Sequence, residues 1–270
     1  MSAPVRIAVL KCDTPNPAVL AAYGDYRAIF STLFEKSLQA FKASAPGTEN
    51  VEFVVDDFHV RDDMKYPNNI DLYDAVLLTG SSASAYENLE WINKLVEFVR
   101  FVATDRPNVR LIGICFGHQI IARALGGECV PNDGKWEIGP TKLDLTEAGK
   151  KLFGVPELNI QQMHRDHVPK VPSSFHLLGS SPVSPNQGMV ELYPGASPES
   201  LKPEDVHIFT VQGHPEFHQQ IVDEIVKARS SIGVFDNANV EDYQQRAEWK
   251  NDGVDVVGKT IWNILCAARG

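Results

Sequence analysis

Short apolar runs alternate along the chain with longer segments whose apolar residues recur at helical spacing. The short runs predict buried strands near residues 5–10, 51–55, 75–80 and 109–112. Helices are predicted near residues 17–42, 90–103 and 120–125. Because strands and helices alternate, we expect an α/β fold in which helices cover a mostly parallel sheet.

The pattern changes after Gly127. Residues 136–139 and 141–145 alternate between apolar and polar positions, which predicts antiparallel strands at an edge of the sheet with one wet face. Residues 189–193 predict a further strand between loops rich in proline and serine, which we place at the rim of the site. The stretch 239–268, which contains Trp249 and Trp262, has mixed helical spacing, and a packing helix is favoured there over a partner-docking surface.

The composition is typical of one soluble enzyme domain. The chain has 270 residues, of which 43% are hydrophobic and 22% charged, and this suffices for one large core. We therefore predict a single domain over residues 1–270, with a C-terminal helical extension from about residue 239.

Charge and cysteine usage exclude several classes of protein. The formal charge of −10 and the lack of a basic run argue against binding to nucleic acid or to an anionic membrane surface. No signal-peptide pattern and no bilayer-spanning apolar run occur. The four cysteines form no Cys-x-x-Cys pair, which disfavours zinc and fits a reducing compartment. We expect a location in the cytoplasm, with the nucleus as a second location.

The strongest candidate for chemistry is Cys115, which stands between Gly113 and Gly117 where a predicted strand gives way to a helix. In the hydrolase form of this motif, such glycines leave room for a strained turn that exposes the nucleophile. A helix N-terminus also favours a thiolate and offers unpaired backbone N–H groups to an oxyanion. The alternative is a buried, inert cysteine, the commoner fate of this residue. The flanking glycines favour the nucleophile.

A candidate base follows the apolar run 208–211. Pro215 favours an extended conformation at His214, so that the side chains of His214 and Glu216 point to the same side. An imidazole can take the thiol proton and later protonate a leaving amine, while a carboxylate holds its tautomer and orientation. The sequence therefore predicts a catalytic triad of Cys115, His214 and Glu216.

Residues 113–119 and 213–216 together resemble the signatures of the class I, triad-type glutamine amidotransferase family. The resemblance extends from about residue 5 to residue 217. It implies a flavodoxin-like α/β sandwich with a mostly parallel central sheet, antiparallel edge strands and a cysteine nucleophile elbow. Within the family, residues 7–13, 23–26 and 115–127 resemble stand-alone relatives, among them the plant gamma-glutamyl peptidases and fungal amidotransferase-like proteins.

The resemblance also implies roles for residues outside the triad. The oxyanion hole would be formed by Gly80, Ser81 and Phe116. The γ-glutamyl group would bind against Gln119, His164 and Asp166. From the sequence alone, Gly80 is equally well an ordinary turn glycine at the end of a strand.

The segment 161–167 contains two histidines and an aspartate, a composition that also occurs in metal sites. Because a third close donor is lacking at these spacings, we expect a solvated loop and no metal. We expect His118 to be a structural residue on the side of its helix, since the family pattern places a pocket residue at Gln119 instead.

The predicted reaction is hydrolysis of a γ-glutamyl amide through a thioester on Cys115, with glutamate as one product. No phosphate-binding or nucleotide-binding loop occurs, so we expect no cofactor and no ammonia-accepting domain. Either a separate synthetase subunit receives ammonia released from glutamine, or the chain works alone as a γ-glutamyl peptidase on glutathione or its conjugates.

Two further alternatives are disfavoured by particular residues. A non-catalytic regulatory subunit that binds a γ-glutamyl ligand would be expected to lack a triad residue, and none is missing. Another group of cysteine hydrolases of similar fold usually carries a histidine directly after the elbow cysteine, where this chain has Phe116.

Overall fold

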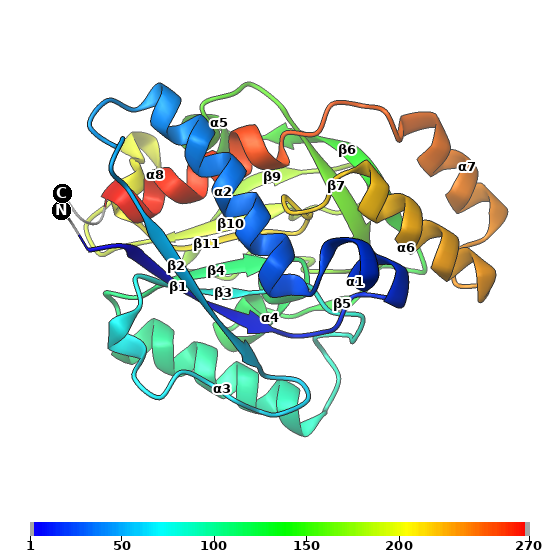
Figure 1. The fold of residues 1–270 in the computed structure, drawn as a ribbon, viewed down its shortest axis with the longest axis horizontal. Coiled ribbons are helices and arrows are strands. Elements are labelled where there is room, and N and C mark those ends of the chain that lie inside the picture. Colours follow the sequence, from blue (N-terminus) through cyan, green and yellow to red (C-terminus); the bar gives the residue numbers. More distant parts are fainter. Residues whose placement is uncertain (1–2, 268–270) are drawn as a thin grey trace.

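The computed structural model describes residues 3–267 and shows helices on both faces of one large mixed sheet (Figure 1). Nine of the described strands form this sheet, in the order β2-β1-β3-β4-β11-β10-β9-β6-β7. The parallel part consists of β2 (Phe53–His59), β1 (Val5–Lys11), β3 (Ala75–Leu78), β4 (Arg110–Ile114) and β11 (Val206–Val211). The antiparallel part adds β10 (Gly188–Leu192), β9 (Phe175–Ser180), β6 (Glu137–Leu145) and β7 (Leu158–His164). A separate short pair joins β5 (Val130–Pro131) to β8 (Asp166–His167).

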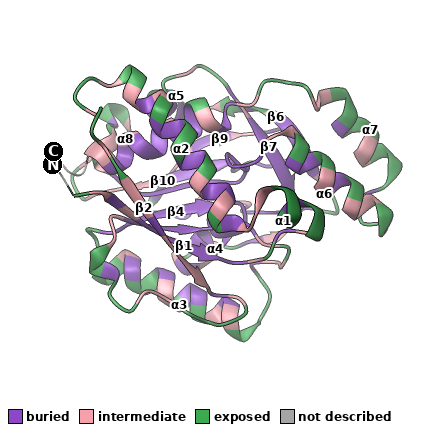
Figure 2. Ribbon diagram, viewed as in Figure 1, coloured by how far each residue is buried: buried purple, intermediate pink, exposed green. Residues whose placement is uncertain are grey.

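Side chains alternate across the sheet and build one apolar cluster on each face. In β1, Ile7 and Val9 belong to one cluster, whereas Ala8 and Leu10 belong to the other. The first face is covered by α1 (Pro17–Tyr23), α2 (Tyr26–Ser44), α5 (Glu147–Phe153), α6 (Gln219–Ser231) and α8 (Lys259–Ala267). The second is covered by α3 (Glu90–Asp105) and α4 (Phe116–Ala124). Figure 2 shows buried positions on the strands and inner helix faces, as the predicted sandwich requires.

The helix predicted over residues 17–42 is two helices. Gly24 adopts a φ of 80° and ends α1, a conformation that favours glycine. Asp25 then caps α2, because its Oδ1 accepts a hydrogen bond of 3.1 Å from the Ala28 N–H. The chain turns between the two helices, and this turn brings α1 to α6 (Figure 1).

Two expectations for the antiparallel part are corrected. Residues 137–145 form one continuous strand, β6, in which Gly139 takes a φ of 77° at the point where we expected a break. The outermost strand is β7, so β6 is covered on both sides. The strand β10 lies inside the sheet, paired with β11 on one edge and with β9 on the other. None of residues 189–193 lines a hollow at Cys115, so the expected place at the rim of the site is wrong.

The C-terminal region contains α7 (Asn237–Arg246), a π-helical turn (Gly253–Gly258) and α8. Trp262 is fully buried, and its Nε1 donates to the Phe34 carbonyl oxygen at 3.2 Å and to Ser37 Oγ at 3.0 Å. This agrees with a packing helix, although Trp249, expected in the same helix, is 49% exposed and follows α7. Residue 268 lies outside the described residues. That residues 1–270 form a single domain stays a prediction.

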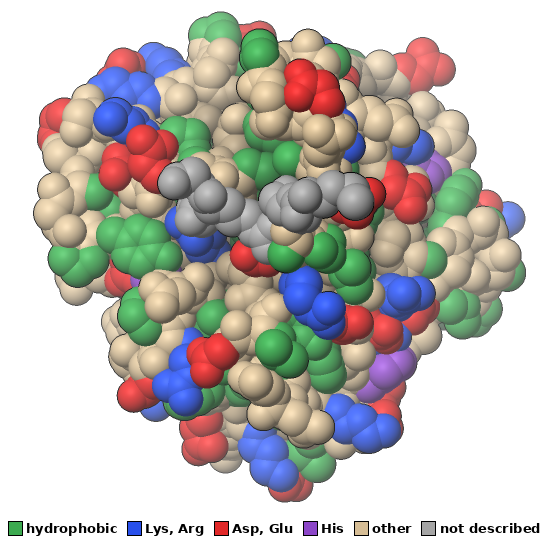
Figure 3. All heavy atoms as spheres, turned by 60° about the vertical axis from the view of Figure 1, so that its left-hand side comes forward, with side chains coloured by type: hydrophobic (Ala, Val, Ile, Leu, Met, Phe, Trp, Pro, Cys, Tyr) green, Lys and Arg blue, Asp and Glu red, His purple; other side chains and the backbone are tan. Residues whose placement is uncertain are grey.

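The surface in Figure 3 carries Lys and Arg side chains interspersed with Asp and Glu side chains, without an extended basic area. Within residues 3–267, no helix is both long enough and apolar enough to cross a bilayer.

Candidate active site

The parallel strands bring four loops to one edge of the sheet. Their carboxyl ends lead into Asp13 after β1, Gly80 after β3, Cys115 after β4 and His214 after β11. In open α/β sheets, this edge is where ligands bind. Residues that lie between 35 and 201 positions apart in the sequence therefore meet at one place.

Cys115 occupies the elbow predicted from the sequence. Its φ of 53° and ψ of −105° are unusual for a residue with a side chain, a strain of roughly 1–3 kcal/mol that the surrounding structure maintains. A Cβ on Gly113 would lie 2.8 Å from the Gly117 carbonyl oxygen, and one on Gly117 would collide with the Leu78 carbonyl oxygen. Gly113 thus allows β4 to lie close to the start of α4, and Gly117 allows α4 to lie against the end of β3.

His214 and Glu216 form a buried ion pair beside the elbow. The Nδ1 of His214 lies 2.8 Å from Glu216 Oε1, so the predicted pairing of these side chains is present. The ring of His214 stacks on Phe217 at 4.2 Å between centroids, nearly parallel to it. The backbone N–H of His214 donates to the Gln161 carbonyl oxygen at 2.7 Å. Phe217 therefore supports one face of the His214 ring, and the hydrogen bond to Gln161 fixes the backbone of His214.

The charge on His214 is stabilised from both ends of the ring. Burial opposes the imidazolium form, but the interactions with Cys115 and then Glu216 outweigh burial and raise the pKa of His214 to about 10. Folding therefore takes up a proton on this group, a stabilising contribution present below the ordinary value of 6.5 and lost as the pH rises through about 10. The arrangement favours the imidazolium form of His214.

A titration of His214 checks this electrostatic coupling. We expect its ¹⁵N imidazole signals to remain those of an imidazolium at pH 8 in the wild type. In Cys115→Ala the same signals should titrate at a lower pH, because the largest contribution that raises this pKa has been removed. A His214 signal that is already neutral at pH 7 in the wild type would contradict the pairing.

Gly80 lies against both catalytic candidates. A Cβ added at this position would lie 2.8 Å from His214 Cε1 and 3.7 Å from Cys115 Cβ. Because Gly80 has no side chain, the imidazole of His214 can occupy this space. The close approach distinguishes Gly80 from an ordinary turn glycine. Ser81, the next residue, lines the same hollow as Cys115.

Gly80→Ala should lower kcat by roughly 10²-fold, because displacing a catalytic group by about 1 Å has effects of that size. The melting temperature should change little in comparison, since the added methyl displaces one ring and no strand. Steady-state glutamate release and thermal melting measure the two effects. Gly134→Ala is the control for a glycine replacement away from the site: its φ of 75° predicts a loss of stability, and kcat should stay unchanged. Unchanged kcat in Gly80→Ala would refute this placement.

Asp13 holds the loop that follows Gly80, a role that the sequence did not reveal. Its Oδ2 accepts hydrogen bonds of 2.6 Å from both the backbone N–H and the hydroxyl of Ser82. Its Oδ1 pairs with Arg61. The available signal was an acidic residue directly after the first strand, at the edge where the site forms.

Phe116 is the first residue of α4, and its backbone N–H therefore belongs to the unpaired first turn of that helix. Its ring is buried and stacks on Trp91 at 5.4 Å between centroids. The side chain anchors the helix start while the N–H stays next to Cys115.

The three predicted pocket residues lie together on the other side of Cys115. Gln119 Nε2 donates to the Asp166 carbonyl oxygen at 2.9 Å and to Gln212 Oε1 at 3.1 Å. His164 Nδ1 lies 3.0 Å from the same Asp166 oxygen. The expectation of a solvated loop over residues 161–167 is wrong: the segment belongs largely to β7 and β8, and Gln161, Gln162, His164, Asp166 and His167 are all buried.

Glu137 holds the ring of His164 through its Nε2 atom. The sequence did not reveal this role of Glu137. Its Oε2 lies 3.1 Å from His164 Nε2, and its Oε1 accepts from the Ser181 hydroxyl at 2.6 Å. Burial alone would raise the pKa of Glu137, but the contacts with His164 and Ser181 outweigh burial and lower it. The residue lies in β6, which pairs with β7, so the register of these strands aligns the two side chains.

Two hollows meet at Cys115. The larger, of about 270 Å³, extends toward α1 and α6, and the smaller, of about 50 Å³, extends toward Gln119, His164 and Asp166. Residues of the Ser81–Ser82 turn, Cys115, Met163 and Arg229 line both. Substrate can therefore contact the thiol from two sides.

Other titratable groups near the sheet edge are unsuited to the chemistry. Burial raises the pKa of Cys12 to about 12 and also raises that of Cys129, which keeps both as thiols. Burial lowers the pKa of His118 to about 3, and its Nδ1 lies 2.8 Å from Thr210 Oγ1, as expected for a structural residue.

One group of side chains has the composition of a metal site, namely Asp25, Asp57 and His59. The ammonium of Lys11 lies 2.6 Å from Asp25 Oδ2 and 2.5 Å from Asp57 Oδ2. A cation of the chain itself thus neutralises these carboxylates.

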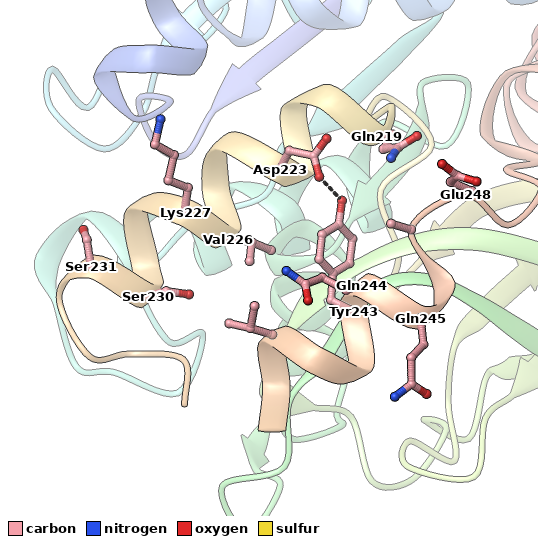
Figure 4. Close-up of a pocket in the computed structure, with 12 residues that line it drawn as sticks. Gln219, Asp223, Val226, Lys227, Ser230, Ser231, Tyr243, Gln244, Gln245 and Glu248 are labelled. Carbon is pink, nitrogen blue, oxygen red and sulfur yellow. Dashed lines mark hydrogen bonds between the residues drawn. The ribbon is translucent and has the colours of Figure 1, made fainter. Parts of the chain in front are cut away.

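A third hollow, of about 780 Å³, lies between α6 and α7 (Figure 4). Tyr243 donates to Asp223 Oδ1 at 2.6 Å across it. None of its described lining residues also lines a hollow at Cys115. The helix α6 separates this groove from the site.

Comparison with known proteins agrees with the fold and the signatures. The family model named glutamine amidotransferase class-I matches residues 47–229, more than half of the chain. A glutamine amidotransferase-like protein of Schizosaccharomyces pombe is 35% identical over 246 residues, which cover 90% of this chain and 92% of the relative. Gamma-glutamyl peptidase 3 of Arabidopsis thaliana is 31% identical over 270 residues, with coverage of 97% and 94%.

Among solved structures, a glutamine amidotransferase from Thermotoga maritima aligns over 100% of both chains with a TM-score of 0.66 and 16% identity. At this identity the likeness concerns the fold, and it confirms the predicted α/β sandwich. The family model and the relatives of at least 30% identity show more than the fold: this chain belongs to the class I glutamine amidotransferase family.

Proposed function

We propose that this protein hydrolyses a γ-glutamyl amide through a γ-glutamyl thioester on Cys115. The observation that carries the proposal is the convergence of an elbow cysteine, a buried His214–Glu216 pair at 2.8 Å and the side-chain-free position Gly80. A nucleophile, a base and a group that orients the base are the parts that this chemistry requires.

In the first half-reaction, the Cys115 thiolate attacks the δ-carbonyl carbon and forms the C–S bond. The electron pair of the C=O bond moves to the oxygen, which the backbone N–H groups of Phe116 and of the Gly80–Ser81 segment stabilise. As the tetrahedral intermediate collapses, the C–N bond breaks and the His214 imidazolium gives its proton to the nitrogen. An amine and the thioester result.

In the second half-reaction, neutral His214 takes a proton from water while the water oxygen attacks the thioester carbon. The C–S bond breaks, glutamate leaves, and the thiolate–imidazolium pair is restored. Glu216 keeps the ring in place through both halves. The γ-glutamyl group itself would lie in the smaller hollow against Gln119, His164 and Asp166.

The released amine is ammonia if the substrate is glutamine and an amino acid or peptide if it is a γ-glutamyl peptide. A separate synthetase subunit as ammonia acceptor and a location in the cytoplasm or nucleus both stay predictions. The regulatory-subunit alternative is disfavoured because such a subunit would be expected to lack one of Cys115, His214 and Glu216, and all three are present.

Glutamate release by the purified chain, measured with glutamine and with glutathione, tests the proposal. We expect release from one or both substrates that disappears when Cys115 is replaced by alanine. Release that is equal in the variant, or ligand binding without any release, would contradict hydrolysis at Cys115.

A further inference from the structure

The two hollows at Cys115 differ in which catalytic group faces them. His214 lines the larger hollow and does not line the smaller one, whereas Gln119 and Asp166 line only the smaller. In the proposed reaction, His214 protonates the departing nitrogen, so the leaving amine must lie on the side of His214. The larger hollow is therefore on the leaving-group side of the scissile bond.

The size of the larger hollow exceeds what ammonia requires. A water-sized molecule takes up roughly 30 Å³ of liquid volume. The hollow offers about 270 Å³. This volume suits an amino acid or a short peptide as the leaving group.

The lining of this hollow is mostly apolar and, apart from the His214 imidazolium, includes one cation. Its apolar wall comes from α1, from β7, and from α6 and the residues at the two ends of α6, and it includes Val19, Met163, Phe217, Ile225 and Ile232. Asp13 also lines the hollow, but its carboxylate is engaged by Arg61 and Ser82. An apolar side chain of a leaving group would be buried against this wall.

Arg229 is the cation. Its guanidinium lies over the rings of Trp136 and Phe235, at 5.3 Å and 5.7 Å from their centroids, and these contacts position it. Among residues 3–267, its guanidinium has neither a hydrogen bond nor a carboxylate within ion-pair distance. Arg165, the other arginine nearby, lines only the smaller hollow and lies 3.4 Å from Asp166 Oδ1. Arg229 is thus available to pair with a ligand anion, a geometry that suits a carboxylate.

On the basis of the proposed hydrolysis, we propose that the larger hollow binds the leaving amine and that Arg229 pairs with its carboxylate. The preferred substrates are then γ-glutamyl derivatives of apolar amino acids or short peptides with a free carboxylate. Arg229 would determine substrate specificity by contacting the leaving amine.

A pair of matched substrates tests this assignment. γ-Glutamyl-phenylalanine and γ-glutamyl-phenethylamide share the γ-glutamyl group and the aromatic ring, and differ in the leaving-group carboxylate. For the wild type, we expect kcat/KM to be about 10- to 100-fold higher for the first substrate, the effect of a hydrogen-bonded charge pair. In Arg229→Gln, the two values should agree within about 3-fold. Glutamine should be cleaved more slowly than γ-glutamyl-phenylalanine.

Three other outcomes would each contradict a different part of the proposal. An equal loss for both substrates in Arg229→Gln would overturn the assignment, because Arg229 would then serve the shared γ-glutamyl part. Glutamine cleavage as fast as that of γ-glutamyl-phenylalanine would overturn the role of the larger hollow. If no substrate gave glutamate in a Cys115-dependent manner, the proposed hydrolysis itself would fail, which is a distinguishable result.

Lys227→Gln is the matched control. It removes a cation from the same helix at a position that lines neither hollow at Cys115, and should leave the substrate ratio unchanged. If Arg229→Gln melts below the assay temperature, Arg229→Lys replaces it, and partial retention of the carboxylate preference is expected. The ratio of the two substrates in the wild type tests the proposal without any variant.

Discussion

Cys115→Ala is expected to lower glutamate release by roughly 10⁴- to 10⁶-fold, the range observed when a nucleophile is removed from a triad. The physical reason is that no other described thiol reaches the site as a nucleophile: burial keeps Cys12 and Cys129 protonated, and Cys266 lies in α8 and lines neither hollow at Cys115. The fold should persist, because alanine is smaller than cysteine and retains the elbow backbone. Continuous glutamate detection and circular dichroism measure the two parts of this prediction.

Cys129→Ala serves as the control for removing a buried thiol. Cys129 is 4% exposed and lines neither hollow at Cys115, so its replacement should affect stability more than turnover. Residual activity above one-hundredth of the wild type in Cys115→Ala would show that the chemistry is elsewhere.

Glu216→Gln should lower kcat/KM by roughly 10²- to 10⁴-fold without unfolding the protein. The carboxylate lies 2.8 Å from His214 Nδ1 and helps to raise the pKa of His214. A neutral amide removes that charge and can offer a donor to Nδ1, which selects the wrong tautomer. Steady-state kinetics over a range of pH should show activity that no longer extends to alkaline pH, since the imidazolium is then lost at a lower pH.

The chain contains a matched control for this substitution. Glu191 pairs with His207 Nδ1 at 3.4 Å on neighbouring strands, outside both hollows at Cys115. Glu191→Gln should therefore perturb stability by a similar amount and leave the pH profile of turnover unchanged. Equal kinetic effects of the two substitutions would mean that Glu216 acts only through stability.

The sequence was sufficient for features whose cause is local. The two glycines around Cys115 and the spacing of His214 and Glu216 predicted the elbow and the ion pair, because each depends on backbone geometry within a few residues. The alternation of strands and helices likewise predicted the layers of the sandwich.

The sequence was insufficient where contacts between distant segments determine the structure. Polar residues 161–167 look like a solvated loop until β6 and the neighbouring loops cover them, so their burial is not visible in the local pattern. The break between α1 and α2 depends on a single glycine that a helix can also tolerate.

Three site residues were missed for a related reason. Asp13, Glu137 and Arg229 act on loops or side chains that are distant in the sequence, and each comes from a segment without a motif. Their position becomes visible only when the carboxyl ends of the strands are brought to one edge. The sequence offered a signal of this kind only at Asp13, an acidic residue that directly follows the first strand.

The most direct test of the central claim is partitioning of the γ-glutamyl group between water and added hydroxylamine during turnover. If a thioester on Cys115 forms, two substrates with different leaving amines pass through the same intermediate. The ratio of γ-glutamyl hydroxamate to glutamate should then be identical for glutathione and γ-glutamyl-phenylalanine, and neither product should form with Cys115→Ala. A ratio that depends on the leaving amine would contradict a common intermediate and, with it, the proposed role of Cys115.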